Sequence, residues 1–167
     1  IVLTVGAVDR WEDKGFGGLI KLWGNMSKRY PDWELWIVGD GNKQSMRTLE
    51  MMIEQYRLRN SVRLLGYRDD VYDLMYKSAV FVLASKQEGM PNCLIEAMSQ
   101  GCACISFDCV AGPREIITDG ISGRLVSDQN WYEMEEKLGY MLGDERERER
   151  FAINALKEAR RFSAKQI

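Results

Sequence analysis

The chain has 167 residues, 46% of them hydrophobic, which is enough for one domain that buries about 70% of the surface its unfolded chain would expose. Its 23 basic and 25 acidic residues give a net charge of -2, so no excess of positive charge is available for a nucleic-acid backbone. Histidine is absent, which excludes His-dependent nucleophilic triads, imidazole acid–base catalysis and His-ligated zinc.

The first half of the chain predicts three strands, each followed by a helix. Short apolar runs predict strands at 1–5, 34–38 and 62–65. Apolar residues at helical spacing predict helices at 16–30, 45–58 and 71–75. Pro31 stops the first helix, and Asp69 or Asp70 is the expected N-cap of the third.

The second half continues the alternation. We expect strands at 79–83, 103–107 and 124–126, a helix at 92–100 and a helical turn after Pro113. Asp128 is the expected N-cap of a helix through Met141. The alternating charges at 145–150 are typical of a helix face in contact with solvent.

These elements define the expected fold class. Wholly apolar strands alternating with helices favour an α/β, Rossmann-like fold, with a parallel sheet of about six strands and helices on both faces. No apolar run reaches the roughly 18 residues of a membrane span, and no signal sequence opens the chain. Because 1–5 already has the composition of a buried strand, we expect a soluble piece of a longer polypeptide.

The cysteines bear on the expected compartment. All four lie within one short stretch and lack the Cys-x2-Cys pairs of a zinc site. We expect reduced, mostly buried thiols in a reducing cytoplasm. They are Cys93, Cys102, Cys104 and Cys109.

In a parallel sheet, ligands bind beyond the carboxyl ends of the strands. The search for a site therefore narrows to the loops at 6–15, 39–44, 66–70, 84–92 and 108–114. In the loop 84–92, Glu88 precedes a helix whose first N–H groups can bind a phosphate oxygen. Glu96, eight residues later, can face the same crevice and bind sugar hydroxyls. The alternative is that both glutamates are ordinary surface residues.

Two cations lie in the loop 6–15. Arg10 and Lys14 immediately precede a helix N-terminus, where the helix dipole disfavours positive charge. A bound anion would remove that conflict. The alternatives are that Lys14 is a solvated loop residue and that Trp11 and neighbouring acids hold Arg10.

Two glycine-containing turns are candidate contacts for a flat ring. The turn at 39–41 follows an apolar strand but lacks the third glycine of a dinucleotide fingerprint, so we interpret it as a tight turn against which a ring can lie. The segment 66–68 can offer backbone groups to the edge of a base. Without Asp-x-Asp or a carboxylate cluster, we expect no metal site.

The order and spacing of these motifs resemble the C-terminal half of two-domain, retaining GT-B glycosyltransferases of group 1, family 4. The resemblance covers nearly the whole chain. It is carried by Val5-Gly6 with Lys14-Gly15, by 37–41, by 62–67, by 85–97, by Gly112 to Ile117, and by Asp119-Gly120 to Val126. It implies that the chain is one half of a GT-B fold and that the acceptor-binding N-terminal domain is absent from it.

The resemblance also assigns roles. Glu88 is similar to the family glutamate at the reacting sugar, Glu96 to the one that binds the ribose, and Lys14 to the lysine that neutralises the diphosphate. Residues whose backbone meets the sugar and diphosphate would be Gly89, Met90, Pro91, Asn92, Cys93 and Leu94. The base would lie at Gly39, Tyr67 and Arg68. Ala7 stands where family members often carry arginine, and Arg10 is the candidate replacement.

The implied activity is metal-independent, cofactor-free hexosyl transfer from a nucleoside diphosphate sugar, with UDP expected as the commonest donor nucleotide. The acceptor would be a saccharide or a lipid-linked saccharide in polysaccharide biosynthesis. We expect a cytoplasmic protein, at the inner membrane face in its full-length form, and no transfer by the isolated fragment. The alternatives are a nucleotide-sugar epimerase of similar architecture and a non-catalytic nucleotide-binding module.

Overall fold

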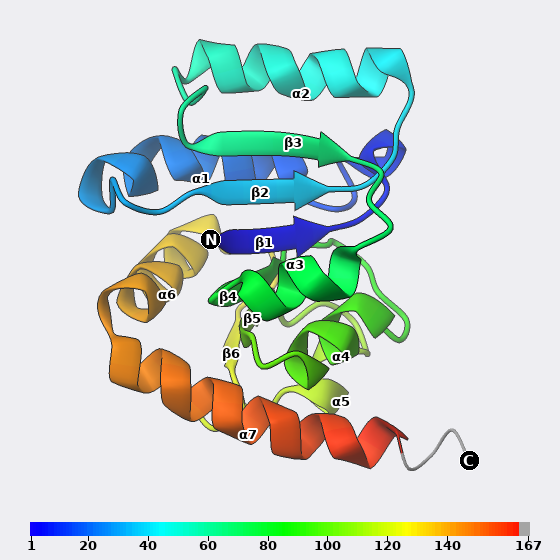
Figure 1. Ribbon diagram of the computed structural model, residues 1–167, viewed down its shortest axis with the longest axis vertical. Coiled ribbons are helices and arrows are strands. Elements are labelled where there is room, and N and C mark those ends of the chain that lie inside the picture. Colours follow the sequence, from blue (N-terminus) through cyan, green and yellow to red (C-terminus); the bar gives the residue numbers. More distant parts are fainter. Residues whose placement is uncertain (164–167) are drawn as a thin grey trace.

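The computed structural model describes residues 1–163, and a parallel sheet forms its centre (Figure 1). The strands are β1 (Val2–Val5), β2 (Leu35–Val38), β3 (Val62–Gly66), β4 (Val80–Leu83), β5 (Ala103–Phe107) and β6 (Arg124–Val126). They are hydrogen-bonded in the order β3-β2-β1-β4-β5-β6, and every neighbouring pair is parallel. The predicted six-stranded, Rossmann-like sheet is confirmed.

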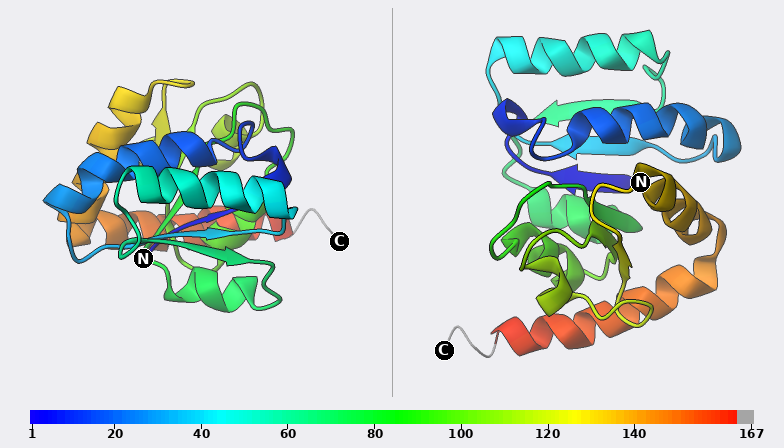
Figure 2. Two further views of the ribbon diagram at one scale, coloured as in Figure 1. Left: turned by 90° about the horizontal axis from the view of Figure 1, so that it is seen from above. Right: turned by 180° about the vertical axis from the view of Figure 1, so that it is seen from behind.

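Helices cover both faces of this sheet (Figure 2). They are α1 (Phe16–Arg29), α2 (Lys43–Gln55), α3 (Val71–Lys77), α4 (Asn92–Ser99), α5 (Pro113–Ile116), α6 (Trp131–Gly143) and α7 (Glu145–Ser163). One buried cluster joins α1, α2 and α6 to the sheet, and a second joins α3, α4 and α5 to its other face. Helix α7 contributes Phe151 to the first cluster and Ala155 and Ala159 to the second.

The local sequence explains most helix boundaries. On α1, Leu19, Trp23 and Met26 are buried at helical spacing, and the helix ends two residues before Pro31. Helix α2 begins at Lys43, two residues earlier than predicted, because the side chain of Asn42 accepts a hydrogen bond from the Ser45 backbone N–H at 2.8 Å.

Three local predictions require correction. The N-cap of α6 is Asn130, which accepts from the Glu133 N–H at 3.0 Å, and not Asp128. Asp70 occupies the N-cap position of α3, but its carboxylate does not cap the helix because Arg68 holds it. The segment Val8–Arg10, expected as loop, forms the 3-10 helix η1.

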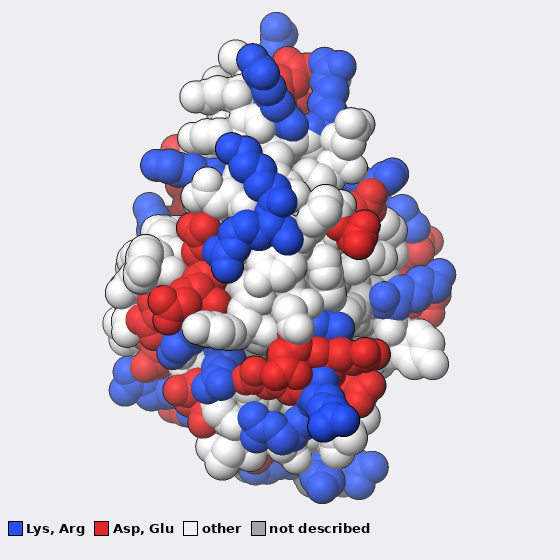
Figure 3. Space-filling view, turned by 90° about the vertical axis from the view of Figure 1, so that its left-hand side faces the viewer, with Lys and Arg blue, Asp and Glu red and all other residues white. Residues whose placement is uncertain are grey.

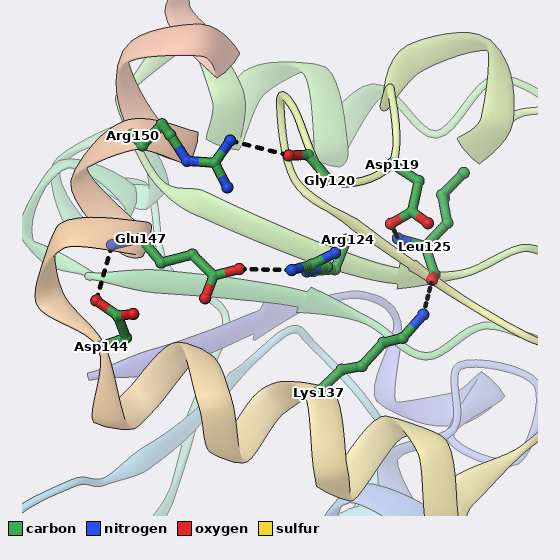
Figure 4. A network of polar contacts seen from close by, with 8 residues as sticks. All are labelled: Asp119, Gly120, Arg124, Leu125, Lys137, Asp144, Glu147 and Arg150. Atoms are coloured by element: carbon green, nitrogen blue, oxygen red, sulfur yellow. Dashed lines mark hydrogen bonds and ion pairs between the residues drawn. The ribbon is translucent and has the colours of Figure 1, made fainter.

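A polar network joins β6 to α6 and α7 (Figure 4). The Arg124 guanidinium donates to the Glu147 carboxylate at 2.7 Å, and Lys137 donates to the Leu125 carbonyl at 2.9 Å. Arg148 turns inward to the carbonyls of Met141 and Leu142. Glu147 and Arg148 are therefore half-buried. The segment 145–150, predicted to face solvent, is only partly exposed.

Surface charge is mixed in sign. On the side of the molecule shown in Figure 3, acidic residues gather in a band across the lower half, basic residues surround them, and much of the centre is uncharged. Within residues 1–163, no helix is both long and apolar enough to cross a bilayer.

Candidate functional site

The strand order places the candidate site between β1 and β4. The chain leaves β1 toward β2 on one side, whereas β4 starts the second half of the sheet on the other. At such a switch point the loops after the two strands diverge and leave a crevice at the carboxyl edge. The loops concerned are 6–15 and 84–91, the same two that carry the predicted phosphate-binding and sugar-facing residues.

Backbone contacts hold these two loops together. The Lys86 N–H donates to the Asp13 carbonyl at 2.8 Å. Gly15 has φ +72° at the N-cap of α1, and a Cβ atom there would overlap the carbonyl oxygen of Ala84. Only glycine fits this close, left-handed position, so Gly15 fixes the distance between the loops.

Lys14 and Glu88 form an ion pair across the crevice. Lys14 Nζ lies 2.9 Å from Glu88 Oε1, and the two side chains are only 17% and 13% exposed. The stem of Lys14 runs past Gly6, where a Cβ atom would lie 3.2 Å from Lys14 Cδ. The structure thus brings together the predicted cation and the predicted catalytic carboxylate, 74 residues apart in sequence.

A cavity of about 550 Å³ opens beside this pair. Its lining includes all three predicted catalytic residues, Arg10, Lys14 and Glu88, together with Gly89. Arg10 is exposed and forms a long ion pair, 3.7 Å, with Asp13.

The cavity wall also contains residues that lie in the expected loops 84–92 and 108–114 but were not among the predicted site residues. Gln87, Val110 and Ala111 also line it. Ala111 has φ +65°, an uncommon conformation for a residue with a side chain. Gly112 lies so close to Gly89 that a Cβ atom would overlap the Gly89 carbonyl oxygen. The loop 108–112 is therefore folded directly onto the glycine after Glu88, a proximity for which the sequence carries no periodic signal.

The N-terminus of α4 is open toward the same edge. Its N-cap is Pro91, and no side chain caps its first turn, so the amides of Asn92 and Cys93 are left for a ligand. Met90 is 49% exposed, whereas the side chain of Leu94 is fully buried in the second core cluster. The Leu94 N–H donates to the Pro91 carbonyl at 3.0 Å, so the predicted contact of Leu94 with a ligand would require this bond to open.

Glu96 lies one turn into α4 and pairs with a tyrosine of α3. Its carboxylate raises the pKa of the Tyr72 hydroxyl, mainly through its negative charge and also through a hydrogen bond. Burial raises the pKa of Cys93 to about 12, with further contributions from the Glu88 and Glu96 carboxylates. Both glutamates thus act on the same thiol, which stays protonated and is no nucleophile at neutral pH.

The residues expected at the base lie farther along the edge and are partly engaged. The Gly39 N–H donates to the Gly66 carbonyl at 2.9 Å, so it is not free for a ligand. Arg68 donates two hydrogen bonds to Asp70, at 2.8 and 2.7 Å, and this pairing lowers the pKa of that carboxyl. Tyr67 is 73% exposed. None of the three lines the 550 Å³ cavity.

Two expectations concern metal and thiols. Within residues 1–163 no group of three or more Cys, Asp or Glu residues is placed to hold a metal ion. The four cysteines are free thiols, with Cys102, Cys104 and Cys109 buried and Cys93 partly buried. The expected burial is confirmed for three of the four thiols, and their reduced state stays a prediction.

Known proteins are similar to this chain in sequence and in fold. The family model "Glycosyl transferases group 1" matches residues 1–158. The amylovoran biosynthesis glycosyltransferase AmsD of Erwinia amylovora is 34% identical over 151 residues, which cover 90% of this chain and 41% of that protein. An N-acetylgalactosaminyltransferase of Campylobacter jejuni, named for a diphospho-undecaprenol-linked acceptor, is 31% identical over 99% of this chain and 44% of its own length.

Solved structures agree. Anabaena HepE in complex with UDP superposes with a TM-score of 0.85 at 23% identity, covering 96% of this chain and 44% of that one. The C-terminal domain of the group 1 glycosyl transferase LpcC from Francisella tularensis gives 0.83 at 26% identity, covering 96% of this chain and 84% of that one. The chain spans less than half of the two curated relatives. Because the family model matches nearly the whole chain, the chain belongs to the group 1 glycosyl transferases.

Proposed function

We propose that the chain is the donor-binding, C-terminal half of a retaining, family 4 hexosyltransferase that takes its sugar from a nucleoside diphosphate, with UDP as the nucleotide. The observation that carries this proposal is the Lys14–Glu88 pair, largely enclosed beside a 550 Å³ cavity at the switch point of the sheet. A carboxylate for the sugar and a cation for the diphosphate stand side by side, as donor binding requires.

The pair suggests what donor binding does. With no donor present, Glu88 balances the charge of Lys14. An incoming diphosphate carries more negative charge than one carboxylate, so it competes for Lys14 and leaves Glu88 free to accept hydrogen bonds from sugar hydroxyls. Because both side chains are mostly shielded from water, their charges act more strongly on the ligand than surface charges would.

Catalysis then follows from electrostatics. Breaking the bond between the anomeric carbon and the phosphate leaves negative charge on the departing diphosphate and positive charge on the sugar. Lys14 and the uncapped amides of α4 stabilise the negative charge on the diphosphate, with Arg10 at the cavity edge as a further cation. Glu88 faces the positive charge that develops on the sugar. No metal is needed in this scheme, because side chains and amide dipoles supply the positive charge.

The remaining contacts are assigned to the nucleoside. Glu96 is proposed to bind the ribose hydroxyls, and Gly39, Tyr67 and Arg68 to flank the base. Because the Gly39 N–H is already bonded to the Gly66 carbonyl, Gly39 would offer the ring its bare Cα, and Tyr67 its exposed ring. UDP is the proposed nucleotide, supported by the UDP in the HepE complex.

The rest of the enzyme is proposed to lie outside this chain. An N-terminal domain would bind the saccharide or lipid-linked acceptor across a cleft that closes on substrate. This assignment is supported by the acceptor named for the Campylobacter relative and by the chain's coverage of that protein. The chain alone would bind nucleotide without transferring sugar, and the full-length protein would work in polysaccharide synthesis at the cytoplasmic membrane face.

Calorimetric titration of the chain with UDP, GDP and ADP tests this proposal. We expect UDP to bind best and Lys14→Ala to weaken it by about 10- to 150-fold, the equivalent of one charge-assisted phosphate contact. Lys28→Ala, which removes an exposed cation from the last turn of α1, is the matched control and should leave the affinity unchanged.

Arg10→Ala decides whether Arg10 replaces the missing family arginine. A loss smaller than that of Lys14→Ala, but above that of the control, assigns it to the diphosphate; no loss removes it from the site. Absence of binding by all three nucleotides, or equal binding by the Lys14→Ala variant, would contradict the donor-site proposal. Sugar transfer by the chain alone would contradict the missing-domain proposal.

A further inference from the structure

A second cavity, of about 330 Å³, lies outside the proposed donor site. Its walls include the rings of Trp11 and Trp131, and its floor is the first turn of α1 at Gly17 and Gly18. We call it the tryptophan cleft. It belongs to the face of the sheet covered by α1 and α6, which lie on the same side of the molecule in Figure 2 (right).

The glycine pair makes this cleft possible. A Cβ atom at Gly17 would lie 3.0 Å from Trp11 Cζ3, and one at Gly18 would overlap the indole ring of Trp131. Two indoles thus rest on bare helix backbone on either side of one turn. The ring of Trp131 is also held edge-on against Phe107, with ring centroids 4.9 Å apart. Trp131 is therefore positioned before any ligand arrives.

The rim of the cleft is polar and carries charges of both signs. Glu12, Lys21, Lys86 and Gln129 surround the apolar floor. Gln129 has φ +59°, a conformation that costs about 1 kcal/mol for a residue with a side chain and that is over-represented at binding sites. Its one carboxylate and two ammonium groups leave a single net positive charge, which is too little to hold a polyanion, and together with Gln129 they offer donors and acceptors to a neutral ligand with many hydroxyls.

The cleft continues along α6. A neighbouring cavity of about 420 Å³ shares Gly18, Lys21 and Trp131 with it and adds Asn25, Tyr132 and Glu135. Tyr132 is 80% exposed, and a third cavity shares Tyr132 and Glu135 and reaches Tyr140. Exposed aromatic rings therefore recur along one groove, with hydrogen-bonding side chains between them.

We propose that the tryptophan cleft binds one pyranose ring of a neutral saccharide and that the groove along α6 holds the units that follow it. A pyranose has an apolar face of C–H groups, which stacks on an indole, and a rim of hydroxyls, which amide, ammonium and carboxylate groups bind. The volume of 330 Å³ lies at the lower end of the roughly 300 to 1,000 Å³ range of small-ligand sites and suits one ring.

The position of the cleft suggests which saccharide this is. Trp11 lies in the loop of Lys14, and Lys86 lies two residues before Glu88, so the cleft adjoins the loops of the proposed donor site. Identifying the ligand as the acceptor or product chain rests on the proposed glycosyl transfer. The groove would hold such a chain on the outside of the domain while its end is processed.

Indole signals in nuclear magnetic resonance spectra of the chain test the cleft directly. The probes are the methyl α-glycosides of glucose, galactose, N-acetylglucosamine and N-acetylgalactosamine, titrated into the millimolar range with and without UDP. At least one should shift the Trp11 and Trp131 indole signals along a common saturable curve. Trp36, which packs in the core cluster of the opposite face, is the internal control and should not move.

Variants give the expected magnitude. Trp131→Ala should weaken the glycoside about tenfold or more, as expected when a central aromatic contact is lost. Because Trp131 also supports Phe107, the exposed double variant Glu12→Ala with Lys21→Ala provides a second test in a folded chain, with an expected loss of a few-fold. Tyr76→Ala on α3 removes an exposed aromatic ring elsewhere and should have no effect.

Three results would refute the proposal that the tryptophan cleft binds a saccharide. They are the absence of shifts with all four glycosides, shifts confined to the loops of Lys14 and Glu88, and Trp11 and Trp131 shifts that follow protein concentration alone, which would identify a second copy of the chain as the occupant. The nucleotide titration is independent of these outcomes. If the chain binds UDP but no glycoside, only the saccharide-binding proposal for the cleft is refuted. If it binds glycosides but no nucleotide, only the donor-site proposal is refuted.

Discussion

At the carboxyl edge of the sheet the Lys14–Glu88 pair faces a cavity, whereas around β6 the charged side chains of α6 and α7 bind Arg124 and backbone groups (Figure 4). Arg124 has Glu147 as a partner and also lies over the ring of Phe151 at 5.3 Å. Arg148 donates to two carbonyls at the end of α6. At the carboxyl edge, by contrast, α4 begins without any side-chain cap.

This difference separates charges that stabilise the fold from charges that are available to a ligand. Around β6 each polar group drawn in Figure 4 already has its partner, so a ligand would have to displace a protein contact there. At the carboxyl edge the close contacts between loops are made by backbone, through glycines. There the Lys14–Glu88 pair lines a cavity in which a ligand can compete for Lys14, and the first amides of α4 have no side-chain cap. Substitutions can test each half of this contrast.

The largest expected effect comes from Gly39→Ala at the carboxyl edge. A Cβ atom there would overlap the carbonyl oxygen of Gly6, and since both partners are backbone, the end of β1 or of β2 must move. We expect the free energy of unfolding to fall by about 3 kcal/mol or more. Urea unfolding followed by circular dichroism measures it.

Gly24→Ala is the matched control, because a Cβ atom within α1 would meet only Tyr56 Cδ1, at an ordinary 3.7 Å. Alanine favours a helix interior, so this variant should gain up to about 1 kcal/mol. Equal stability of the two variants would show that the loops at the carboxyl edge are looser than described.

The fold was accessible to sequence reasoning because its signals are local. Apolar runs such as 103–107 and helical spacing such as Leu19, Trp23 and Met26 report burial directly, and both were confirmed. Two of the three corrected predictions, the N-caps of α3 and α6, lie where two groups compete for one partner. Asp128 and Asn130 are both good capping residues, and only the geometry of the turn decides that Asn130 is used.

A middle-sized effect is expected from the network around β6. Arg124→Ala leaves Glu147, only 16% exposed, without its ion-pair partner and removes the contact with Phe151. We expect the free energy of unfolding to fall by about 1 to 3 kcal/mol.

The comparison variant is Arg59→Ala, which removes the exposed partner of Glu54. No measurable change is expected there, because ion pairs in contact with solvent contribute little. If the two variants proved equally stable by urea unfolding, the paired charges around β6 would be incidental to the fold.

The candidate site was predictable only in part. Lys14 and Glu88 could be nominated because each lies in the loop that follows an apolar strand, but their direct contact depends on the close approach of Gly15 to Ala84, which no spacing reveals. The family resemblance supplied the roles, and the geometry supplied Gln87, Val110 and Ala111, whose side chains carry no chemical signal of their own.

The smallest effect concerns a charge at the opposite edge of the sheet. Glu34, one residue before β2, accepts hydrogen bonds from the Trp36 indole at 2.8 Å and from Arg63 at 3.1 Å. These bonds, the one from Trp36 first, lower the pKa of the Glu34 carboxyl from 4.5. Since the folded pKa lies below the unfolded one, the contribution is complete above pH 4.5 and disappears as the pH falls through the folded value.

Glu34→Gln should therefore be less stable than the parent chain above pH 4.5, by less than about 1 kcal/mol because water screens this partly exposed group, and the difference should shrink in more acidic solution. Unfolding curves at several pH values measure the gap, with Glu50→Gln on α2 as the control for losing an exposed carboxylate. A gap that widens on acidification would have the wrong sign. It would mean that folding raises the pKa of Glu34, and that this edge, unlike the network around β6, holds its carboxylate at a cost.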